Sequence, residues 1–135
     1  MNVQHTAPAA GGTSYRPGVC NIGPAEIAAR RRTGHVGLAA TVVLLVVLLA
    51  IGANPIWRLL LFVPAAVGAS GYLQAAFRFC AGFGWQGVFN FGDRLRDTTP
   101  VEDAEARAAD RRRALQISGL SALVGVVTVL LALLI

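Results

Sequence analysis

Lysine is absent from this 135-residue chain, and charged residues of every kind make up only 14% of it, against 55% apolar residues. The mean hydropathy is +0.58. A soluble domain of this length leaves much of its surface in water, so it cannot hide this much apolar surface. The composition therefore predicts an integral membrane protein.

The absence of several sequence motifs narrows the range of possible functions. The sequence has no phosphate-binding glycine loop, no nucleophile-elbow motif and no HExxH zinc motif. Its two cysteines are too few for a disulfide scaffold. We therefore expect no catalytic residues and no cofactor, and a chain that is not an enzyme.

The N-terminal segment also lacks an apolar run that could serve as a cleaved secretory signal. It is rich in Ala, Gly, Pro and Thr, which is typical of segments that do not fold. Residues 1–22 are predicted to form a disordered cytoplasmic tail.

What the sequence does contain is three runs without a charged residue: 36–53, 59–77 and 114–135. Each is close to the ~20 residues that an α-helix needs to cross a hydrocarbon core of about 30 Å. The predicted fold class is all-α, with a membrane domain over 23–135, three transmembrane helices and a loop over 78–113.

Two helix starts are predicted at prolines. Gly23 before Pro24 fits an N-cap followed by the first helical position, and Gly34 and Gly37 are expected to allow a bend further along. Thr99 has capping-box spacing for a polar helix that continues into the third run.

The positions of the arginines predict the orientation. Of the 12 arginines, only Arg58 lies between the first and second runs; the others precede the first run or lie between the second and third. Because cytoplasmic loops carry an excess of positive charge, the N-terminus and the 78–113 loop are predicted to be cytoplasmic and the C-terminus outside. The arginines expected to contact lipid headgroups and fix this topology are Arg30, Arg31, Arg32, Arg111, Arg112 and Arg113. Since topology explains the basic charge, no nucleic-acid partner is expected.

The loop after the second run contains aromatic residues that are candidates for a segment in the membrane interface. They are Phe79, Phe83, Trp85, Phe89 and Phe91. The alternative is an ordinary aromatic-rich loop packed on the helix ends.

The cysteines and histidines are the remaining residues that could bind a metal ion or carry redox chemistry. Cys20 precedes the first helix and Cys80 follows the second run, so both are predicted at the cytoplasmic face with His35, while His5 lies in the predicted tail. No CxxC or HxxxH spacing is present, so no metal site is predicted, and Cys20, Cys80 and His35 are the residues that would form one. Cys20 and Cys80 are also redox candidates, and the alternative is two reduced, partly buried thiols.

The two thiols are expected to meet only if the helix from Pro24 folds along the membrane. A helix projecting straight into the cytoplasm would lift Cys20 about 18 Å from Cys80.

Residues 20–90 have a recognisable order of elements: Cys20-Asn21-Ile22-Gly23, an arginine cluster, two apolar runs joined by a short turn, and Arg78-Phe79-Cys80-Ala81-Gly82-Phe83-Gly84. This order resembles the YgaP-like transmembrane family of small bacterial inner-membrane hairpins. The positions that match it are Asn21, Gly23, Arg30, Gly34, Cys80 and Gly84. Two features depart from it: Ala81 stands where the family commonly has proline, and the third run is not part of the hairpin. The resemblance implies a multi-pass protein of the bacterial inner membrane and a link to thiol or sulfur chemistry.

Two functions remain. The first is a small non-enzymatic accessory or scaffold subunit of a membrane complex, with membrane lipids and either another membrane protein or further copies of itself as partners. The alternative is a membrane redox or sulfur-handling protein that uses Cys20 and Cys80.

Overall fold

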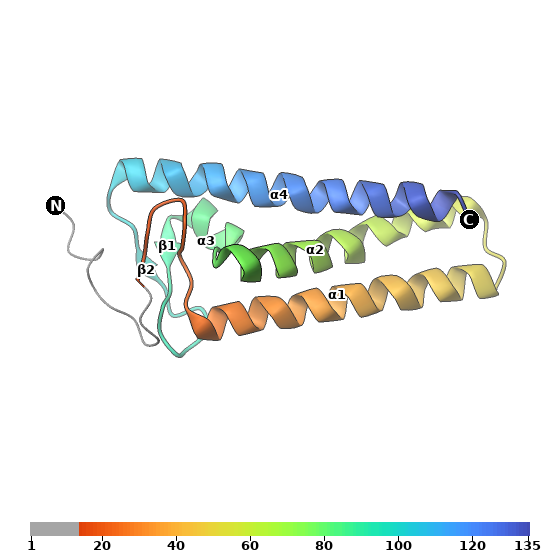
Figure 1. Ribbon diagram of the computed structural model, residues 1–135, viewed down its shortest axis with the longest axis horizontal. Coiled ribbons are helices and arrows are strands. Elements are labelled where there is room, and N and C mark those ends of the chain that lie inside the picture. Colours follow the sequence, from red (N-terminus) through yellow and green to blue (C-terminus); the bar gives the residue numbers. More distant parts are fainter. Residues whose placement is uncertain (1–13) are drawn as a thin grey trace.

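The computed structural model describes residues 14–135, and these are mostly helical. Three long helical segments lie side by side: α1 (Pro24–Ala50), the 3-10 helix η2 (Pro55–Leu61) continued by α2 (Phe62–Phe77), and α4 (Ala104–Leu133) (Figure 1). α2 lies between α1 and α4 and packs against both. The short helix α3 (Ala81–Gln86) and two antiparallel strands, β1 (Val88–Phe89) and β2 (Thr99–Pro100), gather at one end of the bundle.

Three helical segments are long and apolar enough to cross a membrane: Pro24–Ala50, Pro55–Phe77 and Ala104–Leu133. The expectation of a mostly helical chain with three helices long and apolar enough to cross a membrane is therefore confirmed. Two of the helices begin well before their apolar runs, because polar residues of α1 and α4 continue the same helices out of the bundle.

The first helix start is as predicted: Gly23 is extended and Pro24 occupies the first turn of α1. The second is not. Asp103 caps α4 by accepting a hydrogen bond from the Ala106 N–H at 3.0 Å. Thr99 is unavailable as a cap because it belongs to β2, where it pairs with Phe89.

Glycines make the contact between α1 and α2. α1 continues unbroken through Gly34 and Gly37, so the expected bend is absent. A Cβ on Gly37 would lie 2.4 Å from the Gly68 Cα, and one on Gly71 would lie 2.4 Å from the Gly34 nitrogen. These four glycines therefore let the two backbones touch, as small residues do in membrane helix pairs.

Larger side chains join α2 and η2 to α4. The buried Leu61 packs with Val129 and Ala132 near the far end of the bundle. Gly125 accommodates the Phe62 ring, because a Cβ there would meet the ring at 2.7 Å. The serine four residues earlier in α4, Ser121, is buried and bonds to its own helix at the Ile117 carbonyl.

Residues 14–23 and 78–103 form a small folded unit at one end of the bundle, here called the cap (Figure 1). The prediction of a disordered tail does not describe residues 14–22, because Tyr15, Cys20 and Ile22 are buried in the cap; residues 1–13 lie outside the described residues. Four of the five loop aromatics are also buried, and only Trp85 is exposed, at 48%. The aromatic segment is thus packed on the helix ends rather than spread as a surface.

Candidate functional site

Cys80 is held at the junction of the bundle and the cap. It is the N-cap of α3, and both of its backbone groups bond to one side chain, Asn21. The Asn21 Oδ1 accepts from the Cys80 N–H at 2.7 Å, and its Nδ2 donates to the Cys80 carbonyl at 3.1 Å. The next N–H, of Ala81, donates to the Gln74 side chain at 2.8 Å. The position of Cys80 is therefore fixed by Asn21, 59 residues earlier in the sequence, and by Gln74 near the end of α2.

The Cys80 sulfur has a cationic partner. Arg30 Nη2 on α1 donates to the Cys80 Sγ at 2.9 Å. The other terminal nitrogen, Nη1, pairs with Glu26 one turn earlier at 3.1 Å. The guanidinium also lies over the Phe83 ring, 5.5 Å from its centroid. Three contacts thus orient Arg30 toward the sulfur.

Glu26 is itself anchored in the cap. Its side chain is 1% exposed, and its Oε2 accepts from Asn90 Nδ2 at 2.9 Å and from the Arg96 N–H. A buried carboxylate with a cationic partner and two donors satisfies the requirement that buried charges be paired. Glu26 therefore links residues 90–96 of the cap to α1 and, through Arg30, to the Cys80 thiol.

A cavity of about 330 Å³ opens beside this network. Its lining includes Arg30, Cys80, Phe83, Gln86, Arg96 and Thr98. A thiol, two guanidiniums and two neutral polar side chains are donors suited to a small anion. Chemically, an N–H donor aimed at sulfur stabilises negative charge on it, and the thiolate is the nucleophilic form of cysteine.

Cys20 has a different environment. It packs in an apolar cluster with Tyr15, Phe89 and Phe91, and its Sγ lies 3.7 Å from the Ile22 carbonyl, to which it donates. Burial raises the pKa of the Cys20 thiol, although the Ile22 backbone and nearby arginines oppose the shift. The thiol is therefore neutral at physiological pH.

The segments that carry the two cysteines do meet, but without the folding back of α1 that the sequence argument required. The Asn21 N–H donates to the Arg78 carbonyl at 3.2 Å. α1 runs straight from Pro24, and the antiparallel η2–α2 segment is long enough to bring Cys80 back to the start of α1. The two sulfurs nevertheless belong to different clusters, and both cysteines are free.

The other predicted residues are distributed as follows. His35 Nδ1 is 2.7 Å from the Tyr72 hydroxyl across the α1–α2 contact. Within residues 14–135, no group of three or more His, Cys, Asp or Glu side chains could hold a metal ion; His5 lies outside that range. Arg113 Nε donates to the Gly18 carbonyl at 3.0 Å and its guanidinium lies over Phe77. The remaining predicted arginines are exposed: Arg31, Arg32, Arg111 and Arg112.

Sequence reasoning also missed a buried polar contact between the cap and α4. The Tyr15 hydroxyl and the Gly18 N–H both donate to Asp110 of α4, each at 2.7 Å. Burial, then the Asp110 hydrogen bond, raises the pKa of Tyr15 well above its usual range. Tyr15 and Asp110 are 95 residues apart, so no local sequence pattern could have predicted their contact.

No family model, curated protein or solved structure matches the sequence. The resemblance to the YgaP-like family therefore stays a prediction. Its matched residues Asn21, Arg30 and Cys80 are nonetheless in direct contact, through the hydrogen bonds described above.

Proposed function

We propose that the chain is a multi-pass membrane protein with the bundle in the bilayer and the cap on the cytoplasmic side. The supporting observation is the outward display of apolar side chains: only 17% of the most apolar window of α1 is buried. Such a surface is costly in water and favourable in lipid. The resemblance to the YgaP-like family points further to the bacterial inner membrane.

Arginine placement in three dimensions supports this orientation. The cap and the helix ends next to it carry every described arginine except Arg58, at the far end. That exception has a local role, because Arg58 Nη1 donates to the Ala132 carbonyl at 3.0 Å in the last turn of α4. Carbonyls at a helix C-terminus lack partners within the helix, so this arginine is explained without reference to topology.

Within this membrane protein, we propose that Cys80 is a reactive thiol that accepts sulfur from a small anionic persulfide. The proposal rests on the 2.9 Å hydrogen bond from Arg30 to the Cys80 sulfur. Both residues line a cavity that Arg96 also lines. The Cys80 thiolate attacks the outer sulfur of R–S–SH, and the S–S bond between the inner and outer sulfurs breaks. The products are the Cys80 persulfide and the thiolate RS⁻, which keeps the electron pair. Arg30 and Arg96 are placed to bind carboxylates of the donor.

Alkylation of the detergent-purified protein tests this proposal. Iodoacetate, an anionic reagent, should modify Cys80 well before Cys20, whose thiol is neutral and outside the cavity lining. Arg30→Gln should slow Cys80 alkylation by iodoacetate more than by neutral iodoacetamide, whereas Arg31→Gln, the matched control, should change neither. Incubation with inorganic polysulfide should add the mass of a sulfur atom to Cys80. Equal alkylation of the two cysteines in the folded protein would refute the proposal.

A second candidate function is that of an accessory subunit that packs against a helix of another membrane protein. It is favoured by a groove of about 370 Å³ between α2 and α4, where the small residues Ala66, Ser70, Ser118 and Ala122 lie. Small residues let a partner helix approach closely. Ser118→Leu should release a co-purifying membrane partner, whereas Thr128→Leu, on the same helix outside this groove, should retain it.

A further inference from the structure

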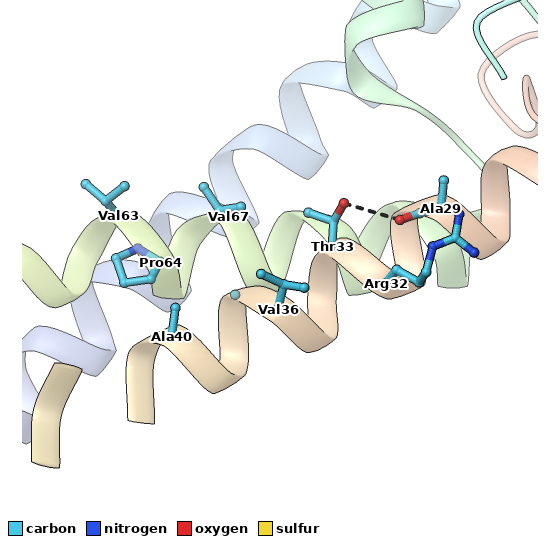
Figure 2. Close-up of a pocket in the computed structure, with 9 residues that line it drawn as sticks. Ala29, Arg32, Thr33, Val36, Ala40, Val63, Pro64 and Val67 are labelled. Atoms are coloured by element: carbon cyan, nitrogen blue, oxygen red, sulfur yellow. Dashed lines mark hydrogen bonds between the residues drawn. The ribbon is translucent and has the colours of Figure 1, made fainter. Parts of the chain in front are cut away.

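A second groove runs along the outside of the bundle between α1 and α2. It has a volume of about 540 Å³, and Figure 2 shows its lining side chains. Val36 and Ala40 of α1 form one wall, and Val63 and Val67 of α2 form the other. Its depth is set by Gly37, whose backbone touches Gly68 and so brings the helices together without filling the space above them.

The groove is apolar along its length and cationic at one end. Val36, Val63 and Val67 are exposed, at 69%, 61% and 47%. The hydroxyl of Thr33 is turned onto its own helix, donating to the Ala29 carbonyl at 3.2 Å. Arg32 lies at the end nearest the cap, is exposed, and has no ion pair among the described residues, where the only salt bridge is that of Arg30.

These dimensions match a single lipid chain. From Arg32, its charged end, to Ala40 the groove follows eight residue steps of α1, or about 12 Å at ~1.5 Å per residue. One leaflet of a ~30 Å hydrocarbon core is about 15 Å deep. Arg32 is four residues outside the charge-free run that begins at Val36, so its guanidinium lies at headgroup level.

We infer that this groove binds one anionic glycerophospholipid of the cytoplasmic leaflet, with an acyl chain along the groove and the headgroup phosphate on Arg32. The inference rests on the membrane placement proposed above. Charge complementarity selects this occupant, because an unpaired guanidinium at headgroup level attracts phosphate and the neighbouring Arg31 adds to the local field. A helix of another chain would bury the apolar walls but leave Arg32 without an anion.

Native mass spectrometry of the purified full chain tests the site. Phosphatidylglycerol and phosphatidylcholine with identical acyl chains, titrated into the detergent solution, are the probes. We expect the first phosphatidylglycerol to bind more tightly than phosphatidylcholine. Arg32→Gln should weaken it about ten-fold, the effect expected for loss of one charge-assisted contact. Arg31→Gln, which removes the same charge beside the groove, should weaken it far less.

A second pair of variants tests the contribution of the apolar groove independently of the charge on Arg32. Val36→Phe places a ring in the groove and should prevent binding, whereas Val43→Phe, at a similarly exposed position of α1 that does not line it, should not. Equal losses in the Arg31 and Arg32 variants would overturn the inference, as would unchanged binding in Val36→Phe. A dimer that Val36→Phe alone dissociates, with lipid binding unaltered, would assign the groove to a second copy instead. Failure of the membrane placement would show separately, as a protein that leaves the membrane fraction on carbonate extraction.

Discussion

Tyr15 and Asp110 show how single residues fix the cap to the bundle. Tyr15 is 2% exposed, stacks on Phe89 with ring centroids 4.8 Å apart, and donates to Asp110 of α4. Asp110 in turn accepts from the Gly18 N–H, so a turn of the N-terminal segment and the first half of α4 share one carboxyl group. A buried acceptor that loses a donor costs more than the net value of one hydrogen bond. The attachment of the segment 14–23 therefore depends on this contact.

Replacing Tyr15 with phenylalanine should loosen the cap while leaving α1 and α2 packed. The ring contact with Phe89 is kept, but Asp110 loses a donor, at a cost on the order of 1–3 kcal/mol. Hydrogen exchange should rise at residues 14–23 and in the first turns of α4. Tyr72→Phe, at the α1–α2 contact, is the control and should leave cap exchange unchanged.

The same tyrosine predicts a dependence on pH. Its pKa is raised in the folded protein, by burial first, so the folded state favours the neutral phenol. The resulting stability is complete below the unfolded pKa of about 10 and is lost as pH rises above it. Cap exchange should therefore increase above pH ~10 in the wild type, and the Tyr15→Phe variant should show a smaller increase over the same range. An identical increase in both proteins would assign the alkaline change to another group.

At the scale of elements, the sequence predicted what depends on local composition. Three charge-free runs gave three helices, since a long run of apolar residues admits few alternatives. The start of α1 at Gly23 and Pro24 was also predictable from adjacent residues. The N-cap of α4 was predicted wrongly: Thr99 pairs with Phe89 in β2, and Asp103 caps the helix instead. The roles of Gly34 and Gly37 were likewise misassigned, because only the partner helix distinguishes a contact from a bend.

The glycine contact gives a prediction for helix packing. Gly37→Ala should separate α1 from α2, because the new Cβ would lie 2.4 Å from the Gly68 Cα, a distance that requires the backbones to move. Overpacking of this kind costs about 1–3 kcal/mol. Gly119→Ala of α4, which meets nothing within 4 Å, should be neutral or slightly stabilising. Unfolding in SDS, followed by circular dichroism, measures both; equal stability of the two variants would contradict the close contact.

At the scale of the whole molecule, the polar half of the chain is organised by contacts that no local pattern contains. Glu26 bonds Asn90, 64 residues away, and Asn21 bonds Cys80, 59 residues away. The sequence therefore predicted Arg30 and Cys80 individually, one for topology and one as a thiol, without joining them. It also predicted the segment 14–22 as a tail, because its composition is that of a loop and its burial depends on partners that fold elsewhere in the chain. Cap and bundle are one unit, so the side on which the cap lies decides where the Cys80 chemistry takes place.

That side is tested by labelling engineered cysteines with a membrane-impermeant maleimide in intact cells. Because Cys80 is proposed to react with alkylating reagents, the parent protein without an engineered cysteine is labelled in parallel and gives the background from the native cysteines. Asn54→Cys in the α1–η2 turn and Ile135→Cys at the C-terminus should label from outside, whereas Leu95→Cys on the exposed cap loop should label only after lysis.

Reversing charge at Arg111 and Arg112, which are exposed, should weaken cytoplasmic retention of the cap and raise outside labelling at residue 95. Arg113 is left unchanged because its contacts with Gly18 and Phe77 would confound the result. Labelling of Leu95→Cys in intact cells without charge reversal would place the cap outside and remove the cytoplasmic thiol site with it.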